Sequence, residues 1–262
     1  MILAVDVGNS NTTVGLFNGT GELLFRALLE TSRSKTRDQC AIELLGVFQL
    51  YGADAGTVDG AILSSVVPPL TTIFTDAIAR LTGIPPMVVG PGIRTGLNIK
   101  AEIHNQLGSD IVASSVAAIA KYPSPIVMVD MGTATSLSLI VGSVYEGCII
   151  MPGLALALDA LSERAAALPP ISIETASPVG LMGHTTEEAM RSGVLYGHAS
   201  MVDGMLERIE ESIGQSVTTV ATGGNAPRIL RYCKRPIQYD ADLIMTGLYL
   251  LYQKNAKKYR KA

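Results

Sequence analysis

The sequence predicts an α/β protein built from two similar halves, each a β-hairpin followed by alternating strands and helices. The first observation is a repeat, because the segment Ile2–Thr12 resembles the segment Ile126–Ser136. In both copies an apolar run ends in Asp-x-Gly, at Asp6 and at Asp130. The second observation is that another apolar strand and a turn follow each acid, as in a β-hairpin. The third is that helical stretches and short strands alternate after each hairpin.

The elements of the first half follow from its apolar runs and turn residues. The predicted strands are residues 2–5, 12–17, 60–67 and 86–90. A helix is predicted between the last two strands, over residues 71–82, and another, rich in Ala and Val, over residues 109–121. This second helix joins the halves, so we expect two domains, residues 1–119 and residues 120–262.

The second half repeats the alternation. The predicted strands are residues 126–129, 136–141 and 218–221, and the predicted helices are residues 186–212 and 242–257. With 262 residues, 48% of them hydrophobic, the chain is long enough for two domains of about 130 residues that each bury a core.

Composition excludes several classes of function. A net charge of -3 lacks the basic excess that sequence-independent nucleic-acid binding needs. No apolar run reaches the roughly 18 to 20 residues needed to span a bilayer, and the N-terminus does not read as a secretion signal. Three widely spaced cysteines argue against both a disulfide framework and a structural zinc site. We expect a soluble, cytoplasmic protein with no nucleic-acid or membrane partner.

The two Asp-x-Gly turns favour phosphate binding. A glycine directly after a strand-end acid lets the backbone approach a ligand, and the following Asn, Ser and Thr residues supply donors. A carboxylate beside those donors repels phosphate unless a cation lies between them, so Asp6 predicts a bound metal ion. Two such turns could hold a nucleotide between the halves. The sequence has neither a P-loop nor a dinucleotide fingerprint.

Two further features have open alternatives. Gly223 and Gly224 follow a predicted strand and suit either contact with an adenine or ribose or a tight strand-to-helix turn. Asp110 begins the helix that joins the halves, where it could accept the proton of an attacking hydroxyl or serve as a routine N-cap. The three histidines have no spacing typical of nucleophilic catalysis or metal ligation.

Together, these motifs resemble the type III pantothenate kinases from residue 1 to about residue 255. The resemblance is carried by Asp6–Thr12, Ser64–Leu70, Val89–Leu97, Asp130–Thr135, Gly147–Gly153 and Thr222–Gly224. It implies two ribonuclease-H-like domains of the actin, sugar-kinase and Hsp70 superfold around an ATP cleft. It also implies a dimer.

The activity implied is ATP-dependent phosphorylation of pantothenate to 4′-phosphopantothenate, the first step toward coenzyme A. The implied ATP-binding residues, with magnesium at Asp6, are Asp6, Val7, Gly8, Asn9, Ser10, Asn11, Thr12, Thr13 and Thr133. Asp130 would bind a monovalent cation, potassium or ammonium, and Asp110 would be the catalytic base. The implied substrate-binding residues are Gly108, Ser109, Asp110, Ile111 and Thr186.

The substrate segment departs from the family. Ile111 stands where the family usually carries an arginine that clamps the pantothenate carboxylate, and Ala101 where it carries a tyrosine. Loss of one charged hydrogen bond predicts roughly ten- to a hundred-fold weaker carboxylate binding.

Three explanations for this departure compete. Lys100, His104 or His184 could replace the cation, a paralogue could complete the site in a mixed dimer, or the substrate could lack a carboxylate. Two functional alternatives also stay open, which are a catalytically weak homologue acting as a nucleotide-binding partner or regulatory subunit, and a sugar or acetate kinase.

Overall fold

The computed structural model describes residues 1–99, 107–174 and 179–259. The chain forms two compact units, the first made of residues 1–121 and 242–262 and the second of residues 122–241. Within the described part of the chain, no helix is both long enough and apolar enough to cross a membrane.

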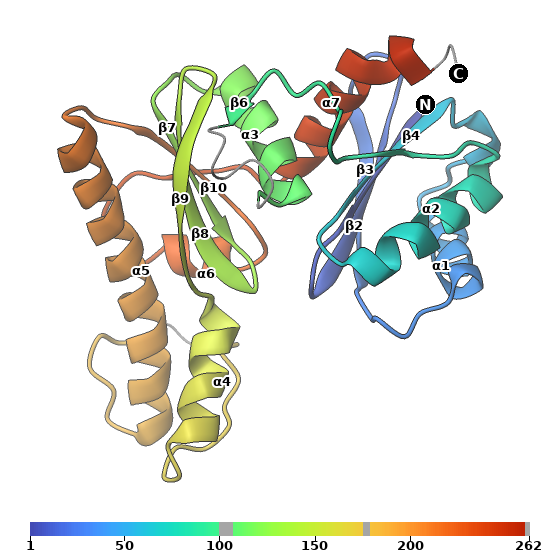
Figure 1. Ribbon diagram of the computed structural model, residues 1–262. Coiled ribbons are helices and arrows are strands. Elements are labelled where there is room, and N and C mark those ends of the chain that lie inside the picture. The colour runs from blue at the N-terminus through green and yellow to red at the C-terminus, as the bar shows by residue number, and fades with distance from the viewer. Residues whose placement is uncertain (100–106, 175–178, 260–262) are drawn as a thin grey trace. The chain divides into compact units, whose positions relative to one another are not determined.

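The first unit is built on a sheet in the order β3-β2-β1-β4-β5 (Figure 1). Its strands are β1 (Ile2–Val7), β2 (Asn11–Phe17), β3 (Leu23–Glu30), β4 (Gly60–Ser65) and β5 (Met87–Val88), and a two-residue strand β6 (Asn98–Ile99) follows. β1 pairs antiparallel with β2 and parallel with β4, so that Asp6 lies opposite Thr13 on one side and Ser64 on the other.

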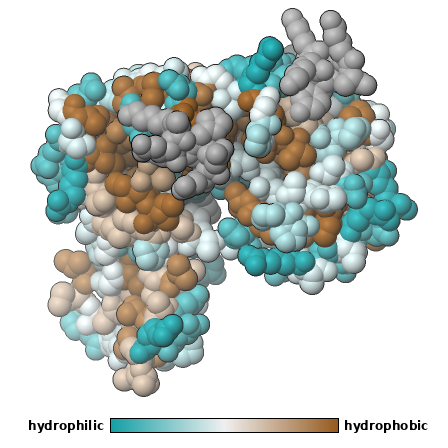
Figure 2. Space-filling model, viewed as in Figure 1, coloured by the Kyte–Doolittle hydropathy of each residue, from teal (hydrophilic) through white to brown (hydrophobic). Residues whose placement is uncertain are grey.

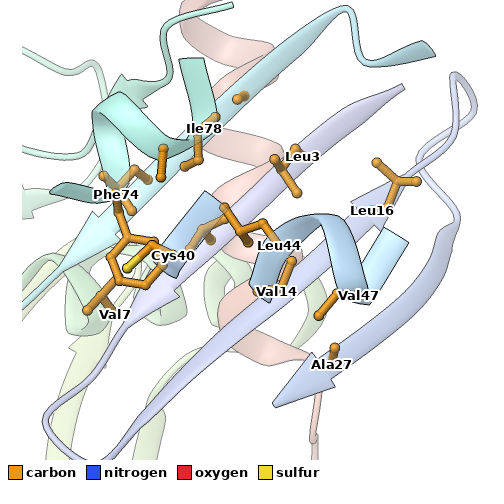
Figure 3. Packing of buried hydrophobic residues seen from close by; sticks show 14 of the residues in the cluster. Leu3, Val7, Val14, Leu16, Ala27, Cys40, Leu44, Val47, Phe74 and Ile78 are labelled. Carbon is orange, nitrogen blue, oxygen red and sulfur yellow. The ribbon is translucent and has the colours of Figure 1, made fainter. Parts of the chain in front are cut away.

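Helices cover both faces of this sheet. α1 (Arg37–Leu50) and α2 (Pro68–Thr82) pack against the face that carries Leu3, Val5 and Val7 (Figure 3). A short 3-10 helix, Ala55–Thr57, precedes β4. The opposite face carries Ile2 and Ala4 and is covered by α3 (Ser109–Lys121) and α7 (Leu243–Tyr259). Because side chains alternate along a strand, Asp6 shares this second face with Ile2 and Ala4.

The second unit repeats the arrangement, with strands in the order β11-β10-β7-β8-β9. Its strands are β7 (Ile126–Met131), β8 (Ala134–Val141), β9 (Val144–Pro152), β10 (Thr218–Thr222) and β11 (Gln238–Tyr239). β7 pairs antiparallel with β8 and parallel with β10, as β1 does with β2 and β4. Its helices, α4 (Leu154–Arg164), α5 (Thr186–Ile213) and α6 (Ala226–Leu230), contribute to one core with β7, β8 and β10.

Local signals explain where the helices begin and end. Thr36 caps the start of α1 and forms a capping box with Gln39. Thr185 does the same for α5 with Glu188. Gly214 ends α5 at a φ of 69°, a left-handed conformation that suits glycine.

The exposed surface of the second unit includes several large apolar side chains. Figure 2 shows apolar and hydrophilic residues interspersed over the visible face. The large exposed hydrophobic residues of this unit are Ile150, Leu156, Leu161, Leu181, Met182 and Tyr239. Several of them belong to β9 and α4, so the surface around these elements is less polar than an ordinary solvated face.

The predicted duplication is confirmed by the strand order, since both units place an antiparallel hairpin beside parallel strands in the same sequence. The assignment of residues 120–262 to one domain differs from the structure. α7 belongs to the first unit, because Met245, Leu248 and Leu251 are buried with Ile2 and Ala4. A local sequence pattern identifies α7 as a helix but does not say which core it enters.

Candidate active site

The turn after β1 presents backbone and polar side chains at the carboxyl end of the strand. Asp6 is buried, at 8% exposure, whereas Asn9, Ser10 and Asn11 are exposed. The amide of Gly8 donates to the carbonyl oxygen of Asn11 at 3.0 Å. A Cβ at Gly8 would lie 2.9 Å from the same oxygen, so only glycine fits this turn without displacing it.

The first residues of β2 point their side chains to opposite faces of the sheet. Thr12 is fully buried, and its hydroxyl lies 2.8 Å from the hydroxyl of Thr31, so its side chain ties β2 to the residue after β3. Thr13 lies opposite Asp6 in the register and therefore shares its face. Val7 is buried in the α1 and α2 core, which leaves only its backbone for a ligand. Two of the predicted ATP-binding residues, Val7 and Thr12, thus use their side chains in packing and hydrogen bonding within the first unit.

Asp110 is the second residue of α3, in the same unit as Asp6. Its Oδ1 accepts a hydrogen bond from the amide of Ile111 at 2.7 Å. Burial raises the pKa of the Asp110 carboxyl, and hydrogen bonds from the backbone amides of Ile111 and Asp110 partly oppose this shift. A Cβ at Gly108 would overlap Oδ1, so the glycine leaves room for the carboxylate.

The elements of the first unit bring Asp110 toward the strand that carries Asp6. The hydroxyl of Ser109 lies 2.9 Å from that of Ser64, and Ser64 is the β4 neighbour of Asp6. Asp6, Thr13, Ser64 and the start of α3 therefore lie on one face, at the carboxyl ends of β1 and β4. Parallel α/β sheets bind ligands at this edge.

The corresponding turn of the second unit follows β7. Asp130 is partly exposed and pairs with Ser136 of β8 and Thr222 of β10. The amide of Gly132 donates to the carbonyl oxygen of Ala134, two residues on, at 3.0 Å, whereas Gly8 donates to Asn11, three residues on. Thr133 is exposed in this second turn. Both turns thus contain a glycine whose amide bonds back within the turn, and the second turn is one residue shorter than the first.

The turn after β10 packs closely on Asp130. Gly223 has a φ of +93°, and a Cβ there would lie 2.6 Å from Oδ1 of Asp130 and from the backbone of Met131. Asn225 donates its side-chain amide to the carbonyl oxygen of Gly132 at 3.1 Å. These contacts favour the tight-turn interpretation for Gly223, since the space a ligand would use beside it is filled by β7.

The predicted substrate residues lie in different parts of the fold. Ile111 is partly exposed in the first turn of α3, and Thr186 is exposed at the first position of α5. Lys100, Ala101 and His104 fall outside the described residues, whereas His184 is exposed just before α5. Ser64 and Thr31 were not predicted individually. A serine at the end of an otherwise apolar strand was the available signal for Ser64.

The described residues contain no group of three or more His, Cys, Asp or Glu side chains that could hold a metal ion. Each turn instead supplies one carboxylate, Asp6 or Asp130. One carboxylate together with phosphate oxygens and waters is a common donor set for Mg²⁺ beside a nucleotide. The residues around Asp6 therefore fit a magnesium ion that is held jointly with a bound triphosphate.

Comparisons with known proteins agree with this geometry. A family model for type III pantothenate kinase matches residues 2–208. A type III pantothenate kinase of Exiguobacterium sp. is 39% identical over 258 residues, which cover 98% of this chain and all of that protein.

Two solved structures share the fold at low sequence identity. The activator of 2-hydroxyisocaproyl-CoA dehydratase from Clostridium difficile, with bound ADPNP, aligns with a TM-score of 0.58 at 11% identity and covers 99% of this chain and 97% of its own. The ROK hexokinase from Thermus thermophilus aligns with a TM-score of 0.50 at 15% identity, covering 95% of this chain and 97% of its own. These structures confirm the predicted fold class, that of the actin, sugar-kinase and Hsp70 superfold. The family match over residues 2–208 and the full-length relative show that the chain belongs to the type III pantothenate kinase family.

Proposed function

We propose that the chain transfers the γ-phosphoryl group of ATP to the primary hydroxyl of pantothenate, giving ADP and 4′-phosphopantothenate. Family membership supports this activity, and Asp110 is the observation that carries it. Asp110 is partly buried and directly follows Ser109, whose hydroxyl contacts Ser64 on the face of the sheet that also carries Asp6. A base near a phosphate-binding turn is what hydroxyl phosphorylation requires.

Asp110 would act through Oδ2. Oδ1 already accepts the amide of Ile111, which makes Oδ2 the oxygen for the substrate proton in this proposal. As the hydroxyl oxygen forms its bond to the γ-phosphorus, its proton passes to Oδ2, and the bond to the β–γ bridging oxygen breaks so that ADP leaves. The raised pKa of the buried carboxyl strengthens Asp110 as a proton acceptor relative to an exposed aspartate.

The phosphates of ATP would bind the turn from Asp6 to Thr13. The exposed backbone and side chains of Asn9, Ser10 and Asn11 supply donors, and Asp6 would hold magnesium together with the phosphates. Magnesium would supply charge neutralisation for the triphosphate. Thr133 would bind phosphate at the second turn, and Asp130, a partly exposed carboxylate, suits a monovalent cation such as potassium or ammonium.

The substrate side of the proposal rests on Gly108, Ser109, Ile111 and Thr186. Ile111 offers no charge to the carboxylate of pantothenate. The cation would therefore come from another residue of this chain or from a second chain. An apolar groove of about 440 Å³ in the second unit is consistent with a dimer. The groove is lined by Pro152, Ala157, Leu161, Gly193, Val194, Gly197, His198 and Met201. Light scattering of the purified protein measures whether it is a dimer.

One assay tests the activity. Purified protein is mixed with ATP, magnesium, potassium and pantothenate, and ADP and 4′-phosphopantothenate are measured. We expect turnover in the wild type, no turnover with Asp110→Asn, and ATP binding retained in that variant. Asp76→Asn is the matched control, because Asp76 is exposed on α2 and should leave turnover unchanged.

The same assay separates the alternatives. Absence of ADP with nucleotide binding intact would favour an accessory, nucleotide-binding role. ADP release only with another hydroxylic or carboxylic acceptor would favour a sugar or acetate kinase. Either result contradicts the proposed activity.

A further inference from the structure

The start of α3 is joined to the end of β4 by a cluster of three serines, Ser64, Ser65 and Ser109, which we call the serine junction. The Ser109 hydroxyl lies 2.9 Å from the Ser64 hydroxyl. It also accepts the amide of Ser65 at 3.1 Å and donates to the carbonyl oxygen of Ser65 at 3.2 Å. One side chain thus uses both its donor and its acceptor capacity on the last two residues of a strand.

The geometry distinguishes Ser109 from an ordinary helix cap. A capping serine accepts an amide from the first turn of its own helix. The hydrogen bonds of the Ser109 hydroxyl within the described residues instead all go to β4, 44 or 45 positions earlier in the chain. α3 itself starts with the amide of Val112 donating to the carbonyl oxygen of Gly108 at 3.1 Å. Ser109 therefore fixes the helix to the sheet rather than closing its first turn.

The junction is buried where it meets the sheet. Ser64 is 0% exposed and is the register neighbour of Asp6 on the face covered by α3 and α7. If the Ser64 hydroxyl loses Ser109 as its partner, it cannot bond to water instead, because Ser64 is not exposed to solvent. The position of α3 relative to β4 therefore depends on the Ser109 hydroxyl.

Asp110 follows Ser109 directly, and its own side chain is oriented by local backbone. Oδ1 is held by the amide of Ile111, and Gly108 leaves the space that the carboxylate occupies. The orientation of the carboxylate is thus set within α3, whereas the placement of α3 is set by the serine junction. These two constraints together fix Oδ2 relative to the strand that ends at Asp6.

We propose that Ser109 is a positioning residue for phosphoryl transfer, whose hydroxyl anchors the first turn of α3 to β4 and so places Asp110 for proton acceptance. The proposal rests on the proposed function, in which Asp110 is the base. It assigns the Ser109 hydroxyl to the sheet, and it leaves contact with the substrate to other atoms of the Gly108–Ile111 segment.

The test compares Ser109→Ala with Ser109→Thr and with Ser115→Ala. Ser115 is a matched control, because it is buried on the same helix and its hydroxyl has no hydrogen-bond partner in the described structure. A misplacement of about 1 Å at a reacting group costs roughly a hundred-fold in rate. We expect Ser109→Ala to lower kcat by about ten- to a hundred-fold while the KM for ATP stays within about threefold. Ser109→Thr, which keeps the hydroxyl, should recover most of the loss, and Ser115→Ala should retain wild-type kcat.

Hydrogen exchange provides a second readout that needs no activity. The amides of residues 110–112 should exchange faster in Ser109→Ala than in the wild type, and at the wild-type rate in Ser115→Ala. Unchanged exchange in Ser109→Ala would overturn the anchoring role, whether or not the wild type phosphorylates pantothenate. With an active wild type, unchanged kcat in Ser109→Ala, or equal losses in Ser109→Ala and Ser115→Ala, would overturn positioning alone. An inactive wild type would instead refute the proposed function.

Discussion

Replacing Gly247 by alanine should destabilise the first unit, because α7 and α3 touch through their backbones at this residue. A Cβ on Gly247 would overlap the carbonyl group of Ala113, and a carbonyl cannot rotate away as a side chain does. Overpacking of a core costs up to about 3 kcal/mol, whereas alanine in place of glycine within a helix gains about 1 kcal/mol. We therefore expect the free energy of unfolding to fall by about 2 kcal/mol, which corresponds to a Tm lower by roughly 4 to 8 °C for a chain of this size.

Gly46 provides the control for this measurement. It lies in α1 of the same unit, it is exposed, and no atom lies within 4 Å of the position its Cβ would take. Gly46→Ala makes the same chemical change and should raise the free energy of unfolding by about 0.5 to 1 kcal/mol. Urea titrations of the wild type and both variants measure the difference. The reasoning fails if Gly247→Ala is as stable as Gly46→Ala, since α7 would then not contact α3 as described.

Three further predictions concern the site and the second unit. Ile111→Arg should lower the KM for pantothenate by roughly ten- to a hundred-fold if the chain acts alone, and steady-state kinetics showing an unchanged or raised KM would contradict this. Burial raises the pKa of Asp110, and the base acts in its ionised form, so kcat/KM should fall as the pH drops through a midpoint above the usual aspartate pKa near 3.9. A midpoint at or below that value in the pH profile would count against Asp110 as the base. Glu210→Gln should lower the free energy of unfolding by about 1 kcal/mol at pH 7, since hydrogen bonds from Arg235 and from the amide of Val217 lower the pKa of Glu210. That stabilisation exists above the unfolded-state pKa of about 4.3 and is lost as the pH falls through the native pKa. Urea titrations in which wild type and Glu210→Gln differ in free energy of unfolding by the same amount at pH 7 and at pH 3 would refute this prediction.

Patterns within a few residues predicted the parts of the fold that repeat. Each hairpin follows from an apolar run, an Asp-x-Gly turn and a second apolar run, and both hairpins form as expected. α1 was not predicted, because Ile42, Leu45 and Leu50 are exposed on it and blur the helical spacing of its apolar residues. Periodicity identifies a helix only where its apolar residues share one buried face.

The candidate site also contains parts that local sequence predicts and parts that it does not. The turns at Gly8 and Gly132 are local structures, and their sequences predicted both of them. The serine junction joins residues that are 44 and 45 positions apart, and nothing near Ser109 in the chain indicates that its hydroxyl belongs to β4. Its neighbour Asp110 was predicted through its place at a helix start and through the family resemblance, but the contact that places the helix required the fold.

The return of α7 to the first unit ties the end of the chain to the placement of Asp110. α7 approaches the sheet through glycines, since a Cβ at Gly15 would lie 2.8 Å from Sδ of Met245 and one at Gly60 would overlap Tyr252. It approaches α3 through Gly247, so the helix that carries Asp110 packs against both the sheet and the last helix. Glycine at each of these contacts leaves room for a neighbouring side chain or backbone, and close packing leaves little freedom for α3 to slide. The serine junction fixes one end of α3 and α7 restrains its length, so the base is positioned by residues from three distant parts of the sequence.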